Sequence, residues 1–97
     1  MAMLEDVKQA LRISTTITAF DSEVIDLIAA ARNDLRLSGV LAEKVENDSD
    51  SLIKRAVTLY CKAFFGYDNA DADRQLASYN SMKAHLTLSA EYTEVPV

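Results

Sequence analysis

The chain has 97 residues, of which 49 % are hydrophobic, and its formal net charge is −5. This apolar share is enough for a packed core and excludes a disordered chain, and the length fits a single domain over residues 1–97. Gly (2) and Pro (1) are scarce, so the turns that an all-β protein needs are missing and the composition favours an all-α fold.

The charge and the single cysteine exclude several functional classes. A protein that grips DNA by its phosphates usually carries a basic patch, whereas lysine and arginine are scattered singly here, apart from Lys54 and Arg55. One cysteine, Cys61, allows no intramolecular disulfide and no Cys-rich zinc site. No apolar stretch approaches the roughly 20 residues that span a bilayer, and no secretory signal is recognisable. We therefore expect a soluble, intracellular protein without a membrane partner.

Two helices are predicted in the first half of the chain. The first covers residues 3–12, and the polar stretch STTIT separates it from the second. The second is expected to begin at Asp21 or Ser22 as N-cap and to run to residue 37, with Gly39 as its stop. Its apolar residues recur at three- and four-residue steps and predict a buried face: Val24, Leu27, Ile28, Ala31 and Leu35.

Two more helices are predicted after a polar connection over residues 42–50. The third, residues 51–65, has two adjacent apolar stripes, which indicates the centre of the domain, and Gly66 ends it. The fourth, residues 71–88, carries Leu76, Tyr79 and Leu86 at helical spacing. The tail, residues 89–97, has no evident partner in the sequence. The predicted fold is therefore a small bundle of four helices, with a helical body over residues 3–88, a polar inter-helix loop and an extended C-terminal tail.

The segment FFGYDNADADRQ, residues 64–75, places three oxygen-bearing side chains at the spacing that opens a calcium loop. Such a loop needs Gly at its sixth position and a bidentate Glu at its twelfth. Counted from Asn69, these positions hold Arg74 and Asn80, and no other register works. We interpret the segment as the end of one helix and the acidic start of the next, where carboxylates suit the positive end of the helix dipole. No metal site is predicted.

Cys61 and His85 are the candidates for a nucleophile and its base. Cys61 lies among apolar residues of the third predicted helix, where a free cysteine behaves as a small hydrophobe, and no motif orients His85 toward it. The paired carboxylates fall at helix ends or in polar connections, which indicates solvated charge. The sequence predicts no catalytic residue, no cofactor and no metal ligand, and thus not an enzyme.

The order of these features resembles that of a known family. MLEDVKQALRI, a polar gap and DSEVIDLIAAARNDL, which ends near Gly39, are similar to the first two helices of the phage head–tail connector (adaptor) family. SLIKRAVTLYCKAFFGY resembles the family's central helix with its aromatic-rich turn, and DNADADRQLASYNSMKAHLTLSAEY resembles the terminal helix of members from phages and prophages of Gram-positive bacteria. The resemblance covers about residues 3–92. It departs at residues 15–18, where the chain is Thr-rich and many members are acidic.

The resemblance implies a structural virion protein without enzymatic activity. Family members form a ring beneath the portal after DNA packaging, of about 12 or 13 copies joined by heterologous contacts, and the ring extends the DNA channel. The implied location is the head–tail interface of the virion, with assembly in the bacterial host cytoplasm. The implied partners are the portal protein, head-closure (stopper) or tail proteins and further copies of the chain, with DNA only as cargo.

The resemblance and the exposed helix faces together give expected contact residues. We expect subunit contacts on the outer faces of the second and third helices and at the aromatic end of the third: Arg32, Arg36, Lys62, Phe65 and Tyr67. We expect the portal to dock on the end of the fourth helix and on the tail, whose residues are Glu91, Tyr92, Thr93, Glu94, Val95, Pro96 and Val97.

The alternative is a small helical DNA-binding or regulatory domain. Several short helices can form a helix-turn-helix, but the recognition helix would have to be rich in Arg, Lys, Asn or Gln. Neither the third nor the fourth predicted helix has that composition, so the sequence favours the connector.

Overall fold

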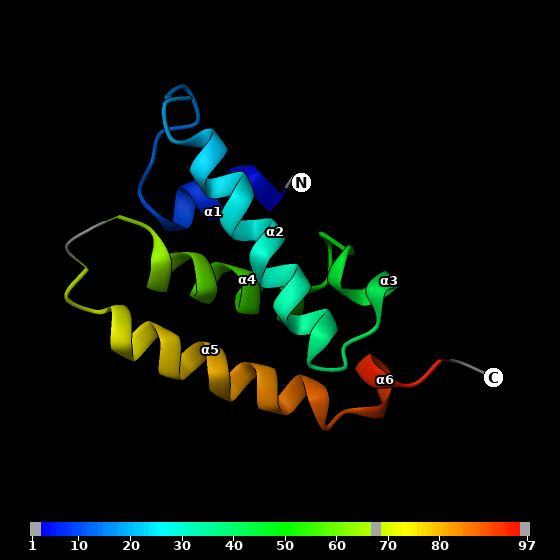
Figure 1. Ribbon diagram of the computed structural model, residues 1–97. Coiled ribbons are helices and arrows are strands. Elements are labelled where there is room, and N and C mark those ends of the chain that lie inside the picture. Colours follow the sequence, from blue (N-terminus) through cyan, green and yellow to red (C-terminus); the bar gives the residue numbers. More distant parts are fainter. Residues whose placement is uncertain (1–2, 67–68, 96–97) are drawn as a thin grey trace.

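A computed structural model describes residues 3–66 and 69–95 of the chain. Its helices are α1 (Met3–Ala10), α2 (Asp21–Leu37), α3 (Ala42–Val45), α4 (Ser51–Phe64), α5 (Ala72–Thr87) and α6 (Ala90–Thr93). No strand occurs within the described residues, so the all-α class is confirmed for that part of the chain. Figure 1 shows α4 in the middle, with α1 and α2 on one side and α5 on the other.

The central helix, α4, begins and packs as its sequence predicts. The Asp50 carboxylate accepts hydrogen bonds from the backbone N–H groups of Leu52 (3.0 Å) and Ile53 (3.1 Å), two of the donors that a helix start leaves unpaired. The helix packs against α1, α2 and α5. Contact on several sides explains its two apolar stripes, because its buried side chains span a broad face: Ile53, Ala56, Val57, Thr58, Leu59, Cys61 and Ala63.

Helix α2 buries the predicted face and ends at the predicted residue. The buried side chains are Val24, Ile28, Ala31 and Leu35, and the fifth predicted residue, Leu27, is only half-buried. Gly39 has a positive φ of 118°. The Gly39 N–H donates to the Arg36 carbonyl (3.1 Å) and the Val40 N–H to the Leu35 carbonyl (3.0 Å). This pair of bonds closes a helix over a residue with left-handed backbone.

The predicted N-cap of α2 at Asp21 or Ser22 is wrong. Phe20 holds the cap position, and no side chain bonds to the first turn. The Asp21 carboxylate instead pairs with the Lys8 ammonium at 2.8 Å. Lys8 is only 3 % exposed and also donates to the Ile17 carbonyl at 2.6 Å. The polar stretch between α1 and α2 is thus held by a cation that reaches it from α1.

Helix α1 is two residues shorter than predicted. It ends at Ala10 because Arg12 adopts a positive φ of 64°, a conformation that cannot continue a right-handed helix. The Ile13 N–H donates to the Lys8 carbonyl (2.9 Å) and the Arg12 N–H to the Gln9 carbonyl (3.1 Å). These are the same two closing bonds as at the end of α2.

The two short helices correct the prediction of a plain polar loop and an extended tail. α3 lies in the predicted loop and buries Val45, and α6 lies in the predicted tail and buries Tyr92. The Tyr92 carbonyl accepts from the Leu41 N–H at 2.8 Å, and the Tyr92 hydroxyl donates to the Asp50 carboxylate at 3.0 Å. Residues 90–93 therefore pack on the body, because an aromatic ring with a hydroxyl finds both apolar contacts and an acceptor there. The four longer helices correspond to the four predicted ones.

Candidate interaction surfaces

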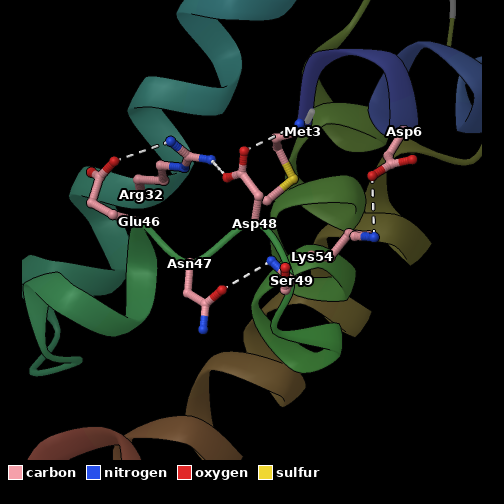
Figure 2. A network of polar contacts seen from close by, with 8 residues as sticks. All are labelled: Met3, Asp6, Arg32, Glu46, Asn47, Asp48, Ser49 and Lys54. Carbon is pink, nitrogen blue, oxygen red and sulfur yellow. Dashed lines mark hydrogen bonds and ion pairs between the residues drawn. The ribbon is translucent and has the colours of Figure 1, made fainter. Parts of the chain in front are cut away.

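Arg32 of α2 is the centre of a polar network that joins α1, α2 and the residues leading into α4 (Figure 2). Its guanidinium bonds to the carboxylates of Glu46 (3.1 Å) and Asp48. The second carboxylate oxygen of Asp48 accepts from the Met3 backbone N–H at 3.4 Å. Only 19 % of the Arg32 side chain is exposed. The charge of this expected interface residue is therefore balanced within the chain.

Figure 2 also shows how the start of α4 is held beside α1. The Lys54 ammonium of α4 pairs with the Asp6 carboxylate of α1 at 3.1 Å. In the turn before α4, the Asn47 side-chain oxygen accepts from the Ser49 backbone N–H at 3.0 Å. The N-terminal ends of α1 and α4 consequently lie on the same side of the molecule.

An apolar hollow of about 430 Å³ lies beside the Arg32 network, between α1 and α2. We call it the N-side hollow. Its apolar lining is Met3, Leu4, Ile25, Ile28 and Ala29, and its polar lining is Arg32, Asn33, Glu46 and Asp48. Ile25 is 50 % exposed. Apolar lining within a polar rim is the composition of many protein contact surfaces.

Lys62 and Phe65 lie together at the C-terminal end of α4. Two adjoining surface hollows, of about 540 and 400 Å³, are both lined by Lys62 and Arg12, and Phe65 also lines the second. The Phe65 ring packs edge-on against Phe20, with ring centroids 5.7 Å apart, and Phe20 remains 45 % exposed. We call Arg12, Phe20, Lys62 and Phe65 the C-side patch. It combines two cations with two aromatic rings.

The other two expected interface residues are Arg36 and Tyr67. Arg36 is exposed on α2, and its guanidinium donates to the Asn33 side-chain oxygen at 2.9 Å. Tyr67 lies outside the described residues. The structure thus brings Lys62 and Phe65 together, whereas Arg32 and Arg36 belong to a different surface on α2.

The packing of α6 buries one residue of the expected portal-docking tail and leaves others exposed. Tyr92 is buried, and the Thr93 hydroxyl, half-buried, donates to the Ser89 carbonyl at 2.9 Å. Glu91, Glu94 and Val95 are exposed. They line a hollow of about 640 Å³ between α3 and α6, together with Leu41, Glu43, Lys44, Asn47 and Ala90. Pro96 and Val97 lie outside the described residues.

A partly buried polar cluster that the sequence did not reveal joins α2 to α5. The Tyr79 hydroxyl donates to the Asp34 carboxylate, and the Lys83 ammonium contacts the same oxygen at 3.0 Å. Burial raises the pKa of Asp34, but the hydrogen bonds from Tyr79 and Lys83 outweigh it and leave this pKa below its ordinary value. Burial, and then the bond to Asp34, raises the pKa of Tyr79. The cluster is structural, because Tyr79 is only 1 % exposed.

The described residues offer little chemistry for catalysis. Burial raises the pKa of the Cys61 thiol to about 12, which keeps it protonated, and no water reaches it. In the acidic segment, Asn69 donates to the Lys62 carbonyl and accepts from the Asp71 N–H at 3.1 Å, so it joins the end of α4 to the start of α5. Within residues 3–66 and 69–95, no group of three or more His, Cys, Asp or Glu side chains is placed to hold a metal.

Among the helices of the described residues, none is long and apolar enough to cross a membrane. The described part of the chain is a small all-helical body with surface hollows and exposed aromatic or aliphatic side chains, which are features of surfaces that contact other proteins. A family model described as "Phage connector protein" matches residues 3–93, and the chain belongs to this phage connector family. Neither a comparison with curated proteins nor one with solved structures gives a significant match. The resemblance to head–tail connectors is therefore confirmed at the level of the family.

Proposed function

We propose that this chain forms a ring beneath the portal after DNA packaging. The ring would extend the channel through which DNA leaves, and it would give head-closure or tail proteins their docking surface. The observation that carries the proposal is the family match over residues 3–93, which spans α1 to α6 of the described residues. In this role the chain is a component of the virion at the head–tail interface, assembled in the host cytoplasm and without enzymatic activity.

The charge of the chain supports a passive role toward DNA. A net charge of −5 opposes the phosphate contacts that produce non-specific DNA binding. DNA would therefore pass the ring as cargo without being held by it. The rival role of a DNA-binding domain has no comparable support, because α4 and α5 present no cluster of basic residues.

The proposal assigns the subunit contacts to the outer surfaces of α2 and α4, with Arg32, Arg36, Lys62, Phe65 and Tyr67 as contact residues. It assigns the portal contact to the C-terminal residues Glu91 to Val97. Because Tyr92 is buried, we narrow the portal contact to the exposed Glu91, Glu94 and Val95 and to the hollow that they line beside α3. Three carboxylates, including Glu43, line this hollow against one ammonium, that of Lys44, so a basic and apolar segment of the portal would suit it.

A charge reversal tests this assignment without removing the buried ring of Tyr92. The double variant Glu91→Lys/Glu94→Lys should weaken binding to the portal ring by at least about tenfold, because like charges would then face the portal segment. The matched control is Glu23→Lys/Asp73→Lys, which makes the same net change at two exposed positions of α2 and α5. Gel filtration of portal mixtures measures both variants. Equal binding by the two variants would refute the assignment.

A further inference from the structure

The N-side hollow and the C-side patch lie at opposite ends of α1 and α4. The N-terminal ends of α1 and α4 lie together, as the contact between Met3 and Asp48 shows. Their C-terminal ends also lie together, since Arg12 and Lys62 share two hollows. In Figure 1 both helices run the same way. The N-side hollow is lined by the first residues of α1 and the C-side patch by residues at the ends of α1 and α4, so the two are at opposite ends of these helices.

Carboxylates outnumber cations at the N-side hollow, whereas the charged residues of the C-side patch itself are cations. The polar lining of the N-side hollow has two carboxylates, Glu46 and Asp48, against the single guanidinium of Arg32. Asp26 adds a third carboxylate near this surface, because it is exposed on α2 and lies one turn before Ala29. The C-side patch contributes the guanidinium of Arg12 and the ammonium of Lys62. Two carboxylates, Asp6 and Asp71, also line the hollows there, and they pair with Lys54 and Arg74.

Both sides also carry exposed apolar groups. The N-side hollow is a depression of about 430 Å³ with five apolar lining residues. The C-side patch carries Phe20, whose ring is 45 % exposed although it packs on Phe65. An exposed aromatic ring next to cations is an effective anchor for an apolar hollow with an acidic rim.

We infer that the N-side hollow of one copy receives the C-side patch of the next copy. This contact joins two different surfaces, so it repeats from copy to copy and closes into a ring when the rotation allows. The occupant of the hollow is a second copy of this chain, and the exposed tail residues stay available for the portal. The inference rests on the proposed ring and names the surfaces that build it.

Cross-linking between two variants, each with one introduced cysteine, tests the inference directly. Ala29→Cys places a thiol in the N-side hollow, and Gln9→Cys places one beside Arg12 and Lys62; both positions are exposed. The native Cys61 is buried and does not react. The two variants are mixed on the portal ring of the same phage and treated with a short bismaleimide. We expect cross-linked dimers from the mixture and none from either variant alone.

Controls separate the contact from chance collisions. Ser81→Cys, at an exposed position of α5, replaces Gln9→Cys in a matched mixture and should give no dimer. Adding Lys62→Glu to the Gln9→Cys chain should lower the yield by at least about tenfold, whereas Lys62→Arg should keep it, since the contact depends on a cation.

The possible outcomes are distinguishable. Dimers from the Ala29/Gln9 mixture alone support the assigned surfaces. If many copies bind the portal but the mixture gives no dimer, the surfaces are wrong while the proposed function stands. Dimers from Ala29→Cys alone would show a symmetric contact and overturn the inference. If no copies assemble on the portal and no dimer forms, the inference and the proposed function both fail.

Discussion

Lys8 is a charged residue whose contacts fix the position of the loop between α1 and α2. Its ammonium lies in the interior and contacts the Asp21 carboxylate at 2.8 Å and the carbonyls of Ile17 (2.6 Å) and Thr15 (3.4 Å). A buried cation is tolerated only when its charge and its hydrogen bonds are compensated. The polar stretch after α1 supplies that compensation, so this loop is part of the fold although its sequence suggests only a spacer.

We expect Lys8→Met to lower the free energy of unfolding by about 2–4 kcal/mol. The apolar side chain fills the space but leaves a carboxylate and two carbonyls without their donor. Urea unfolding followed by circular dichroism measures the change. Arg74→Met is the matched control, because the Arg74 pair with Asp71 is exposed and should contribute no more than about 0.5 kcal/mol. Similar losses in the two variants would contradict the role given to Lys8.

At the scale of elements, α5 is joined to the rest by a mixed apolar and polar contact. α5 packs on α4, and its Tyr79 and Leu86 are buried. Tyr79 also reaches Asp34 of α2, and Lys83 completes the cluster. The hydroxyl of Tyr79 therefore connects two helices that are far apart in the chain, and its protonation is coupled to folding.

Tyr79→Phe should make the protein less sensitive to alkali. The ordinary pKa of tyrosine is 10.0 and that of Tyr79 in the folded chain is higher, so above pH 10 the unfolded chain loses this proton first. The stability from protonated Tyr79 is thus present below pH 10 and is lost as pH rises toward its folded-state pKa.

At about pH 7 the free energy of unfolding of the variant should be about 1–2 kcal/mol lower than that of the wild type, because the hydrogen bond is missing. Between about pH 7 and 11 the free energy of unfolding should then fall less in the variant than in the wild type. Urea titrations at each pH would measure both differences. An equal loss would show that Tyr79 does not titrate on unfolding.

The long helices could be predicted because their patterns are local. Val24, Ile28, Ala31 and Leu35 repeat at helical steps, and Gly39 marks the end of α2. Helices α3 and α6 have four residues each, too few for a period to be read. Their existence depends on tertiary contacts, such as that of Tyr92 with Asp50.

The candidate surfaces were predictable only in part. Lys62 is in the last turn of α4 and Phe65 directly follows that helix, so their proximity follows from their closeness in the sequence. Arg32 is different, because its partners Glu46 and Asp48 come from a later segment whose acids suggest solvated charge. No local pattern indicates that the guanidinium turns inward to them. The N-side hollow has no sequence pattern at all, since it arises where α1 meets α2.

At the scale of the whole molecule, the folded body carries three surfaces. The N-side hollow and the C-side patch lie at opposite ends of α1 and α4, and the hollow between α3 and α6 adjoins the N-side hollow, because Asn47 lines one while its neighbours Glu46 and Asp48 line the other. Figure 1 shows α3 and α6 near the C-terminal end of α5, away from the C-terminal end of α4. A ring component needs such a division, because it contacts two neighbours and a different protein at the same time. We expect that a substitution on one surface leaves the other two able to bind their partners.

The central claim is that the chain assembles on a portal, and mass measurement of that assembly tests it most directly. The purified chain is mixed at micromolar concentration with the portal ring of the same phage, and the complex is isolated by gel filtration, weighed and imaged by electron microscopy. The account predicts a complex with roughly one chain per portal subunit, closed into a ring by symmetry. A portal that elutes and images without any bound chain would contradict it.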